Sequence, residues 1–200
     1  MPQHKLDAAL QFINIANDDD PNIELSEGKE WPKERLYSHR MSDMLERYKP
    51  NANDAIKLAV HAQHIERWKS PRSNFPMNRK GYHQWRTALY TFHANTAAIC
   101  LQKANYDVAF IERVKLAIGK KNLKSNTDSQ LLEDVAALVF IEHYMLGFAE
   151  KHPEYDEEKW LLIVRRTWGK MSKDAQIFAL AGNISLPEPL VPLILKAIKS

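Results

Sequence analysis

Apolar residues recur every three or four positions through most of the chain, the spacing that places them on one face of an α-helix. Runs of alternating β-branched residues are nearly absent, so we predict an all-α fold. Residues 22–32 are polar and are expected to be an irregular connection. The pattern predicts helices over residues 6–17, 33–48, 54–69, 81–102, 107–119, 127–150, 157–168 and 174–181, and a last packed segment over 186–200.

The composition suits one helical domain. The chain has 200 residues, of which 44% are hydrophobic and only six are glycine, enough for a sizeable core. The single Cys100 excludes an internal disulfide and indicates a reducing compartment. No signal-peptide core and no run of about 18 apolar residues is present, so we expect a cytoplasmic protein without a membrane partner. A net charge of +3 argues against nucleic acid as a partner, and the oligomeric state stays open.

Residues 54–86 concentrate the side chains that carry chemistry. His61 and His64 are three positions apart, so on a helix they would share a face and reach one ion or substrate atom. Pro71 disfavours helix at the residue before it, and a loop is expected to begin there. Basic and aromatic residues alternate in and after this loop and predict a cationic, aromatic rim: Arg72, Phe75, Arg79, Lys80, Tyr82, His83, Trp85 and Arg86.

Two carboxylates interrupt the most apolar predicted helix. Glu133 and Asp134 lie near the start of residues 127–150, where hydrophobic residues occupy most faces. Buried carboxylates are costly unless they pair with a metal, an arginine or a histidine. They are therefore candidate site residues. The run Asp18-Asp19-Asp20, by contrast, lacks further oxygen ligands at calcium-loop spacing and is interpreted as a solvated turn.

Four segments together resemble the HD-domain superfamily: YSHRMSDMLERY with His39, LAVHAQHIERW with His61 and His64, TFHANTAAICL with His93, and QLLEDVAALVF with Asp134. The resemblance covers about residues 36–146 and implies one HD-like helical domain over 1–200, with a C-terminal helical extension at 147–200. The strings HAQHIERW, SPR, GYHQWR, LEDVAALVF and TWGKMS more closely resemble an uncharacterised group, domain-of-unknown-function family 4202.

The superfamily resemblance implies an enzyme that hydrolyses a phosphorylated or nucleotide-like small molecule with metal-activated water. His39, His61, His64 and Asp134 would bind a divalent zinc, iron, manganese or nickel ion. The adjacent His-Asp pair of the superfamily is missing here, and Gln63 and His64 stand in its place. Proton transfer would fall to Glu66, Glu133 or His93. Substrate contacts would come from Arg72, Arg79, Arg86, Trp68 and Tyr82.

Other interpretations remain. The same histidines and carboxylate could hydrogen-bond one another without metal, which would leave a non-catalytic nucleotide- or anion-binding protein on a degenerate HD fold. Iron at the same ligands would instead give a redox enzyme. His61-Ala-Gln-His64 and Lys170-Met-Ser-Lys173 also look like the ATP-binding signatures of class I aminoacyl-tRNA synthetases. Gln63 replaces the required glycine, and no strand is predicted before His61, so we reject this last resemblance.

Overall fold

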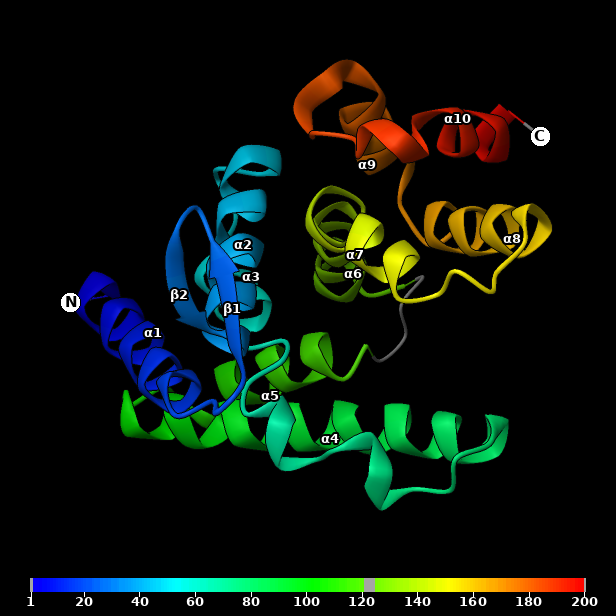
Figure 1. Cartoon of the computed structure of the whole chain (residues 1–200). Coiled ribbons are helices and arrows are strands. Elements are labelled where there is room, and N and C mark those ends of the chain that lie inside the picture. The colour runs from blue at the N-terminus through cyan, green and yellow to red at the C-terminus, as the bar shows by residue number, and fades with distance from the viewer. Residues whose placement is uncertain (1, 121–124, 200) are drawn as a thin grey trace.

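The computed structural model describes residues 2–120 and 125–199, and within them the chain is mainly α-helical with one small hairpin (Figure 1). The predicted all-α, single-domain fold is confirmed. The α-helices are α1 (Pro2–Asp18), α2 (Lys33–Tyr48), α3 (Asp54–His61), α4 (Arg79–Lys103), α5 (Val108–Ile118), α6 (Thr127–Val139), α7 (Met145–Glu150), α8 (Glu157–Trp168), α9 (Lys173–Phe178) and α10 (Val191–Lys199). Short 3-10 turns, η1 (Arg67–Lys69), η2 (Arg72–Asn74) and η5 (Glu188–Leu190), lie between some of them. Residue 200 of the predicted last segment lies outside the described residues.

Helix starts follow the capping residues that the sequence supplies. The side chains of Asn53, Asn126 and Ser172 accept hydrogen bonds from backbone N–H groups in the first turns of α3, α6 and α9. Each bond satisfies a backbone donor that the helix itself leaves unpaired. These helix starts could be predicted from the sequence because each capping residue and its backbone partner lie within three positions of each other.

A β-hairpin replaces the irregular connection that was expected at residues 22–32. Strands β1 (Ile23–Ser26) and β2 (Lys29–Pro32) pair antiparallel, with Ser26 opposite Lys29. The turn residues Glu27 and Gly28 both have positive φ, 52° and 75°, the conformation of a tight two-residue hairpin turn. The prediction missed this hairpin because its strands are short and carry no apolar alternation toward the core.

The Asp18-Asp19-Asp20 run is not wholly solvated. Asp20 is 4% exposed and accepts hydrogen bonds from the backbone N–H groups of Asn22 and Glu34, at 2.9 and 3.0 Å. The side chain therefore joins the end of α1 to the start of α2, across the hairpin. Its partner Glu34 lies 14 positions away along the chain, so the local sequence did not indicate this contact.

The helix that carries His61 ends earlier than predicted. α3 stops at His61, and residues 62–66 form turns before η1. Glu66 has φ 52°, in the left-handed region, which an α-helix cannot contain. Its backbone N–H is held by the side chain of Asn17 at 3.0 Å. His61 and His64 consequently do not share a helical face, and their side chains enter different surroundings.

The predicted helix over residues 127–150 contains a wide turn. α6 and α7 are joined by the π-helical segment η3 (Phe140–Tyr144), and a second such segment, η4 (Ala179–Asn183), follows α9. π-helical turns are rare and occur often at functional sites. Here they shift the side chains that follow them relative to a regular helix, which periodicity alone did not predict.

The hydrophobic core lies where α2, α3 and α6 meet. In Figure 1, α4 and α5 lie along one side of these helices, and α8, α9 and α10 lie on the opposite side. The largest fully buried apolar side chains are Ile13, Met41, Met44, Ile56, Leu58, Ile65, Leu101, Ile118, Leu132, Leu138, Met145 and Ile194. The core thus runs without interruption from α1 to α10.

None of the helices in the described ranges is, by itself, both long and apolar enough to cross a membrane. One pair, Lys173–Asn183 with Glu188–Ile198, reaches that length and composition only when joined across a bend of 120°.

Candidate functional site

Charged and polar side chains meet inside the helical bundle between α2, the turns after α3, and α4. We call Glu34, His64, Arg67, Arg86 and His93 the buried polar cluster. Glu34 and His93 are 5% and 2% exposed, and the other three are partly buried. Glu34 begins α2, His64 and Arg67 follow α3, and Arg86 and His93 lie two turns apart on α4. The cluster is therefore assembled from three separate segments.

His64 is held by contacts to both ring nitrogens. Its Nδ1 lies 3.4 Å from Oε2 of Glu34, and its Nε2 lies 2.9 Å from a guanidinium nitrogen of Arg67. Because arginine can only donate, Nε2 must accept, and the proton of the neutral ring resides on Nδ1 beside the carboxyl group. The ring also stacks on Tyr37, with centroids 4.0 Å apart and planes 14° apart. Burial and then Arg67 keep the pKa of His64 well below its ordinary value of 6.5.

His93 carries an acceptor that no described residue satisfies. Its Nδ1 lies 2.8 Å from the carbonyl oxygen of Ile65, which can only accept, so Nδ1 carries the ring proton. Burial, with a smaller effect of His64, lowers the pKa of His93 to about 3, so the ring is neutral. Its Nε2 is buried and has no hydrogen-bond partner among the described residues. The His93 ring lies beside that of His64, with centroids 5.8 Å apart.

The two guanidinium groups of the cluster pair with no described carboxylate. Arg67 donates to His64 and lies over the Trp85 ring, 5.0 Å from its centroid. Arg86 donates to the hydroxyl of Tyr90 at 3.2 Å. Burial lowers the pKa of Arg67, Glu34 opposes this effect, and the charge of Arg86 adds to it. Two cations that act on each other are thus partly buried without an ion pair to a described carboxylate, which is unfavourable unless another anion binds.

Glu34 is the carboxyl group nearest to these cations, yet it ionises with difficulty. Burial raises its pKa from 4.5 to about 7, although Arg67 and Lys33 lower it. Near neutral pH the protonated and the ionised forms of Glu34 are therefore both populated. Its position is set by Asp20, which accepts from its backbone N–H, and by Asn17, whose side chain lies 3.5 Å from its carbonyl oxygen.

A second charged group, around Glu133, borders the cluster. Glu133 forms ion pairs with Lys120 and with Lys170, the latter at 3.5 Å. Burial opposes its ionisation, but the two lysines lower its pKa below 4.5. The groups are electrostatically linked, since Lys120 also lowers the pKa of His64. Glu133 is therefore an ionised carboxylate already neutralised by lysines.

The structure does not bring the four predicted metal ligands together. His39 is exposed and stacks on Trp31, with centroids 5.8 Å apart. His61 is buried, with its ring nitrogens 2.8 Å from Oγ of Ser42 and 2.5 Å from Oδ1 of Asn14. Within residues 2–120 and 125–199, no group of three or more histidine, cysteine, aspartate or glutamate side chains is arranged to hold a metal ion.

Asp134, the fourth predicted ligand, joins two helices. It is 2% exposed and accepts hydrogen bonds from the backbone N–H of Ser172 at 2.7 Å and from its hydroxyl at 2.5 Å. The side-chain amide of Gln130 donates to it at 2.9 Å. The carboxylate is buried because it fastens α9 to α6, which explains its presence in an apolar helix without a metal.

The predicted catalytic residues separate into two environments. His93 belongs to the buried polar cluster and Glu133 borders it, as described above. Glu66 lies outside, where its carboxylate pairs with Lys69 at 2.6 Å. Its left-handed backbone turns the chain after α3 and so helps to place Arg67.

Of the predicted substrate-binding residues, only Arg86 belongs to the cluster. Arg72 donates to the carbonyl oxygens of Phe75, Pro76 and Asn78, at 3.0, 2.6 and 3.2 Å, and so organises its own loop. Arg79 is exposed beside a surface hollow on α4. The remaining two are aromatic: Tyr82 is 46% exposed, and Trp68 is partly buried with Lys69 near its ring.

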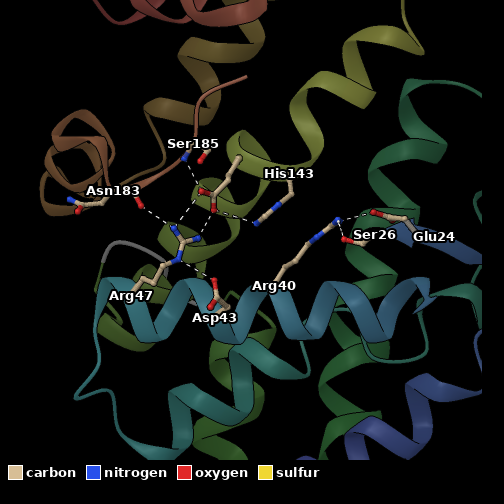
Figure 2. Close-up of polar contacts among 9 residues, drawn as sticks. Glu24, Ser26, Arg40, Asp43, Arg47, His143, Asn183 and Ser185 are labelled. Carbon is tan, nitrogen blue, oxygen red and sulfur yellow. Dashed lines mark hydrogen bonds and ion pairs between the residues drawn. The ribbon is translucent and has the colours of Figure 1, made fainter. Parts of the chain in front are cut away.

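A separate polar network ties the C-terminal helices to α2 (Figure 2). Arg47 pairs with Glu142 of η3 and donates to the carbonyl oxygen of Asn183 at 3.0 Å. Glu142 accepts from the backbone N–H of Ser185 at 2.8 Å, and His143 lies 3.3 Å from it. Both π-helical segments meet here. Since every charge in this network has a partner, we interpret it as structural.

Sequence reasoning missed Glu34 and did not single out Arg67. Arg67 follows His64 by three positions, a spacing that was visible but was assigned to a continuing helix. The sequence signal for a role in the site was weaker at Glu34 than at Arg67. Glu34 appears as an ordinary acidic residue in the first turn of a helix, where it complements the helix dipole. Its burial depends on segments that pack over it from elsewhere in the chain.

Comparison with known proteins places these features in a family. No curated protein and no solved structure matches the chain. A family model described as a domain of unknown function, DUF4202, matches residues 7–194, which include every residue of the buried polar cluster. The chain therefore belongs to the DUF4202 family.

Proposed function

We propose that the protein binds a phosphorylated, nucleotide-like small molecule at the buried polar cluster. The observation that carries this proposal is the pair Arg67 and Arg86, two partly buried guanidinium groups without an ion pair to a carboxylate among the described residues. A guanidinium group presents its donors in a planar fork that matches the oxygens of a phosphate. An anion of this geometry would compensate the charge that the fold leaves unpaired.

The electrostatic surroundings favour an anion over a cation. Lys33 and Lys120 act on His64 in the same direction as the two arginines, lowering its pKa. The nearby carboxyl groups cancel only part of this charge, because Glu133 is paired with lysines and burial raises the pKa of Glu34 to about 7, which leaves it partly protonated at neutral pH. A dianion bound beside His64 would be attracted by all of these cations.

Ligand access is supported by the exposure of His64. Its side chain keeps 21% of its surface accessible, although its two ring nitrogens are engaged inside the protein. A small molecule that contacts this exposed part would lie beside Arg67. The guanidinium of Arg67 also lies over the Trp85 ring, 5.0 Å from its centroid, and this contact helps to hold the arginine in place.

Hydrolysis by metal-activated water, and the HD-like ancestry that implies it, stay predictions. The all-α fold is compatible with both. The predicted ligands have other partners, so we assign no metal and no reaction step to them. A cytoplasmic location likewise stays a prediction. Phosphate release from a bound nucleotide, measured with chelator and with added zinc, iron, manganese or nickel, would decide whether turnover accompanies binding.

Calorimetric titration of the purified chain tests the binding proposal. Adenosine monophosphate should bind, whereas uncharged adenosine should bind at least about tenfold more weakly, since the phosphate supplies the contact with the arginines. Arg67→Gln and Arg86→Gln should each weaken the nucleotide by about tenfold or more. Arg166→Gln is the matched control, because Arg166 is exposed on α8.

Two outcomes would contradict the proposal. One is a chain that binds neither adenosine monophosphate nor inorganic phosphate at millimolar concentration and low salt. The other is binding that survives both arginine substitutions unchanged, which would place the anion elsewhere. Circular dichroism of each variant would establish that the helices are intact, so that lost binding is not lost folding.

A further inference from the structure

The unsatisfied ring nitrogen of His93 constrains the ligand beyond its phosphate. His93 is 2% exposed, and its Nε2 has no hydrogen-bond partner among the described residues. Because Nδ1 donates to the Ile65 carbonyl, Nε2 of the neutral ring carries a lone pair and can only accept. Buried polar groups are nearly always hydrogen-bonded in folded proteins, so this atom calls for a donor.

The place of His93 links this acceptor to the anion site. Its ring is 5.8 Å from that of His64, which keeps 21% of its side chain accessible. His93 also lies close enough to Arg67 and Glu34 for their charges to change its pKa. A ligand that contacts Arg67 and extends past His64 would therefore approach the His93 ring.

The donor must also be compatible with the cations around it. An ammonium group would be repelled by Arg67 and Arg86, whereas a hydroxyl group can donate without adding positive charge. Glu34 would offset the charge of an ammonium only in part, because burial raises its pKa to about 7. A neutral hydroxyl is thus the donor that fits this environment.

From this arrangement we propose that His93 is a specificity-determining residue that accepts a hydrogen bond from a ligand hydroxyl. The ligand class is then a phosphate monoester with a free hydroxyl close to its phosphate, as in a sugar phosphate. This inference rests on the proposed anion site and adds the second point of recognition. The site would bind ligands with this hydroxyl more tightly than ligands without it, because a ligand without the hydroxyl would leave the buried nitrogen unpaired.

Two ligands of equal charge test the inference. The chain should bind glycerol 3-phosphate about tenfold more tightly than propyl phosphate, which has the same carbon chain and no hydroxyl. His93→Leu removes the acceptor and should reduce this ratio to about one while propyl phosphate still binds. His93→Gln retains an acceptor and should restore part of the preference.

A spectroscopic measurement covers the case in which His93→Leu does not fold. In wild-type protein labelled with ¹⁵N-histidine, the Nε2 resonance of His93 should shift on addition of glycerol 3-phosphate and not on addition of propyl phosphate. The resonance is assigned by its loss in His93→Gln.

The possible results separate the two proposals. Equal wild-type affinity for both esters, or an unchanged ratio in His93→Leu, would overturn the role of His93 and leave the anion site standing. Failure of both esters to bind a chain that does bind adenosine monophosphate would overturn the inference alone, and failure of adenosine monophosphate and inorganic phosphate as well would overturn both proposals. A preference for glycerol 3-phosphate with no shift at Nε2 would assign the hydroxyl contact to another residue and also overturn the inference.

Discussion

Arg67 donates a hydrogen bond to Nε2 of His64 at 2.9 Å, although no α-helix spans the three positions between them. The contact depends on the left-handed Glu66, which turns the chain after α3. It fixes the tautomer of His64, and it places a permanent positive charge against the ring. Together with burial, which is the larger cause, this charge lowers the pKa of His64 and keeps the ring neutral beside Glu34.

The neutral histidines predict how stability depends on pH. Burial lowers the pKa of His61 and His93 from 6.5 to about 4 and about 3, and that of His64 well below 6.5. The unfolded chain binds these protons near pH 6.5, so stability falls as the pH falls from 6.5 toward 4.5. Glu34 opposes this trend, since its raised pKa of about 7 lets the folded chain keep a proton that the unfolded chain loses. A net difference of roughly two protons gives a slope of about 1–3 kcal/mol per pH unit.

Urea unfolding followed at half-unit steps of pH measures this slope. His93→Gln should flatten it by roughly one proton, about 1 kcal/mol per pH unit. A variant at an exposed residue without an ionisable side chain, Gln84→Ala, should leave the slope unchanged. Stability that stays constant from pH 6.5 to 4.5 would mean that the three rings are protonated in the folded protein.

The second prediction concerns the link between α2 and the C-terminal helices (Figure 2). Glu142→Gln removes the charge that pairs with Arg47 and weakens the acceptor for Ser185. We expect a loss of about 1–3 kcal/mol, less than for a fully buried pair, because the Arg47 side chain is 36% exposed. Asp43→Asn, which removes the exposed i,i+4 pair with the same arginine, should cost only about 0.3–0.5 kcal/mol.

Chemical denaturation of the two variants gives this comparison directly. Hydrogen exchange should also show faster exchange in α9 and α10 for Glu142→Gln than for Asp43→Asn. Equal effects of the two substitutions would show that the network does not hold the C-terminal helices.

Asp134 should be needed for stability and not for metal content. Asp134→Asn weakens the acceptor for the two Ser172 donors and should destabilise the chain by about 1–3 kcal/mol. Ser172→Ala removes the hydroxyl donor and the cap of α9, and should cost about 1–2 kcal/mol. Elemental analysis of protein purified without chelator should give the same metal content for wild type and Asp134→Asn. A bound metal that is lost specifically in Asp134→Asn would restore its predicted role as a ligand.

Replacing glycine by alanine at two helical positions should have opposite effects on stability. A Cβ at Gly81 would lie 2.0 Å from the carbonyl oxygen of Pro76, so Gly81→Ala must displace the loop before α4. It should destabilise the protein despite the higher helix propensity of alanine. Gly147 in α7 has nothing within 4 Å of that position, and Gly147→Ala should stabilise by about 0.5–1 kcal/mol. Thermal melts of both variants measure the contrast, and two shifts of the same sign would contradict it.

The helices could be predicted because their signals are local. Apolar spacing marks α2 to the residue, and Asn53, Asn126 and Ser172 cap helices within three positions of their own place in the chain. The end of α3 could not be predicted, because it depends on Asn17 holding the backbone of Glu66 from 49 positions away. A hydrogen bond between residues so far apart along the chain cannot be predicted from the local pattern of apolar and polar residues.

The candidate site, like the helices, was only partly predictable from the sequence. The sequence by itself determined a helical chain with histidines, arginines and carboxylates at defined positions on predicted faces, and it pointed to His64, Arg86 and His93. Only the tertiary structure decided that His39, His61 and Asp134 have other partners, and that Glu34 and Arg67 join His64. The physical reason is that burial and pairing of a charge are set by whatever packs around it. In this fold those neighbours come from α1, α2, α4 and α9, far apart along the chain.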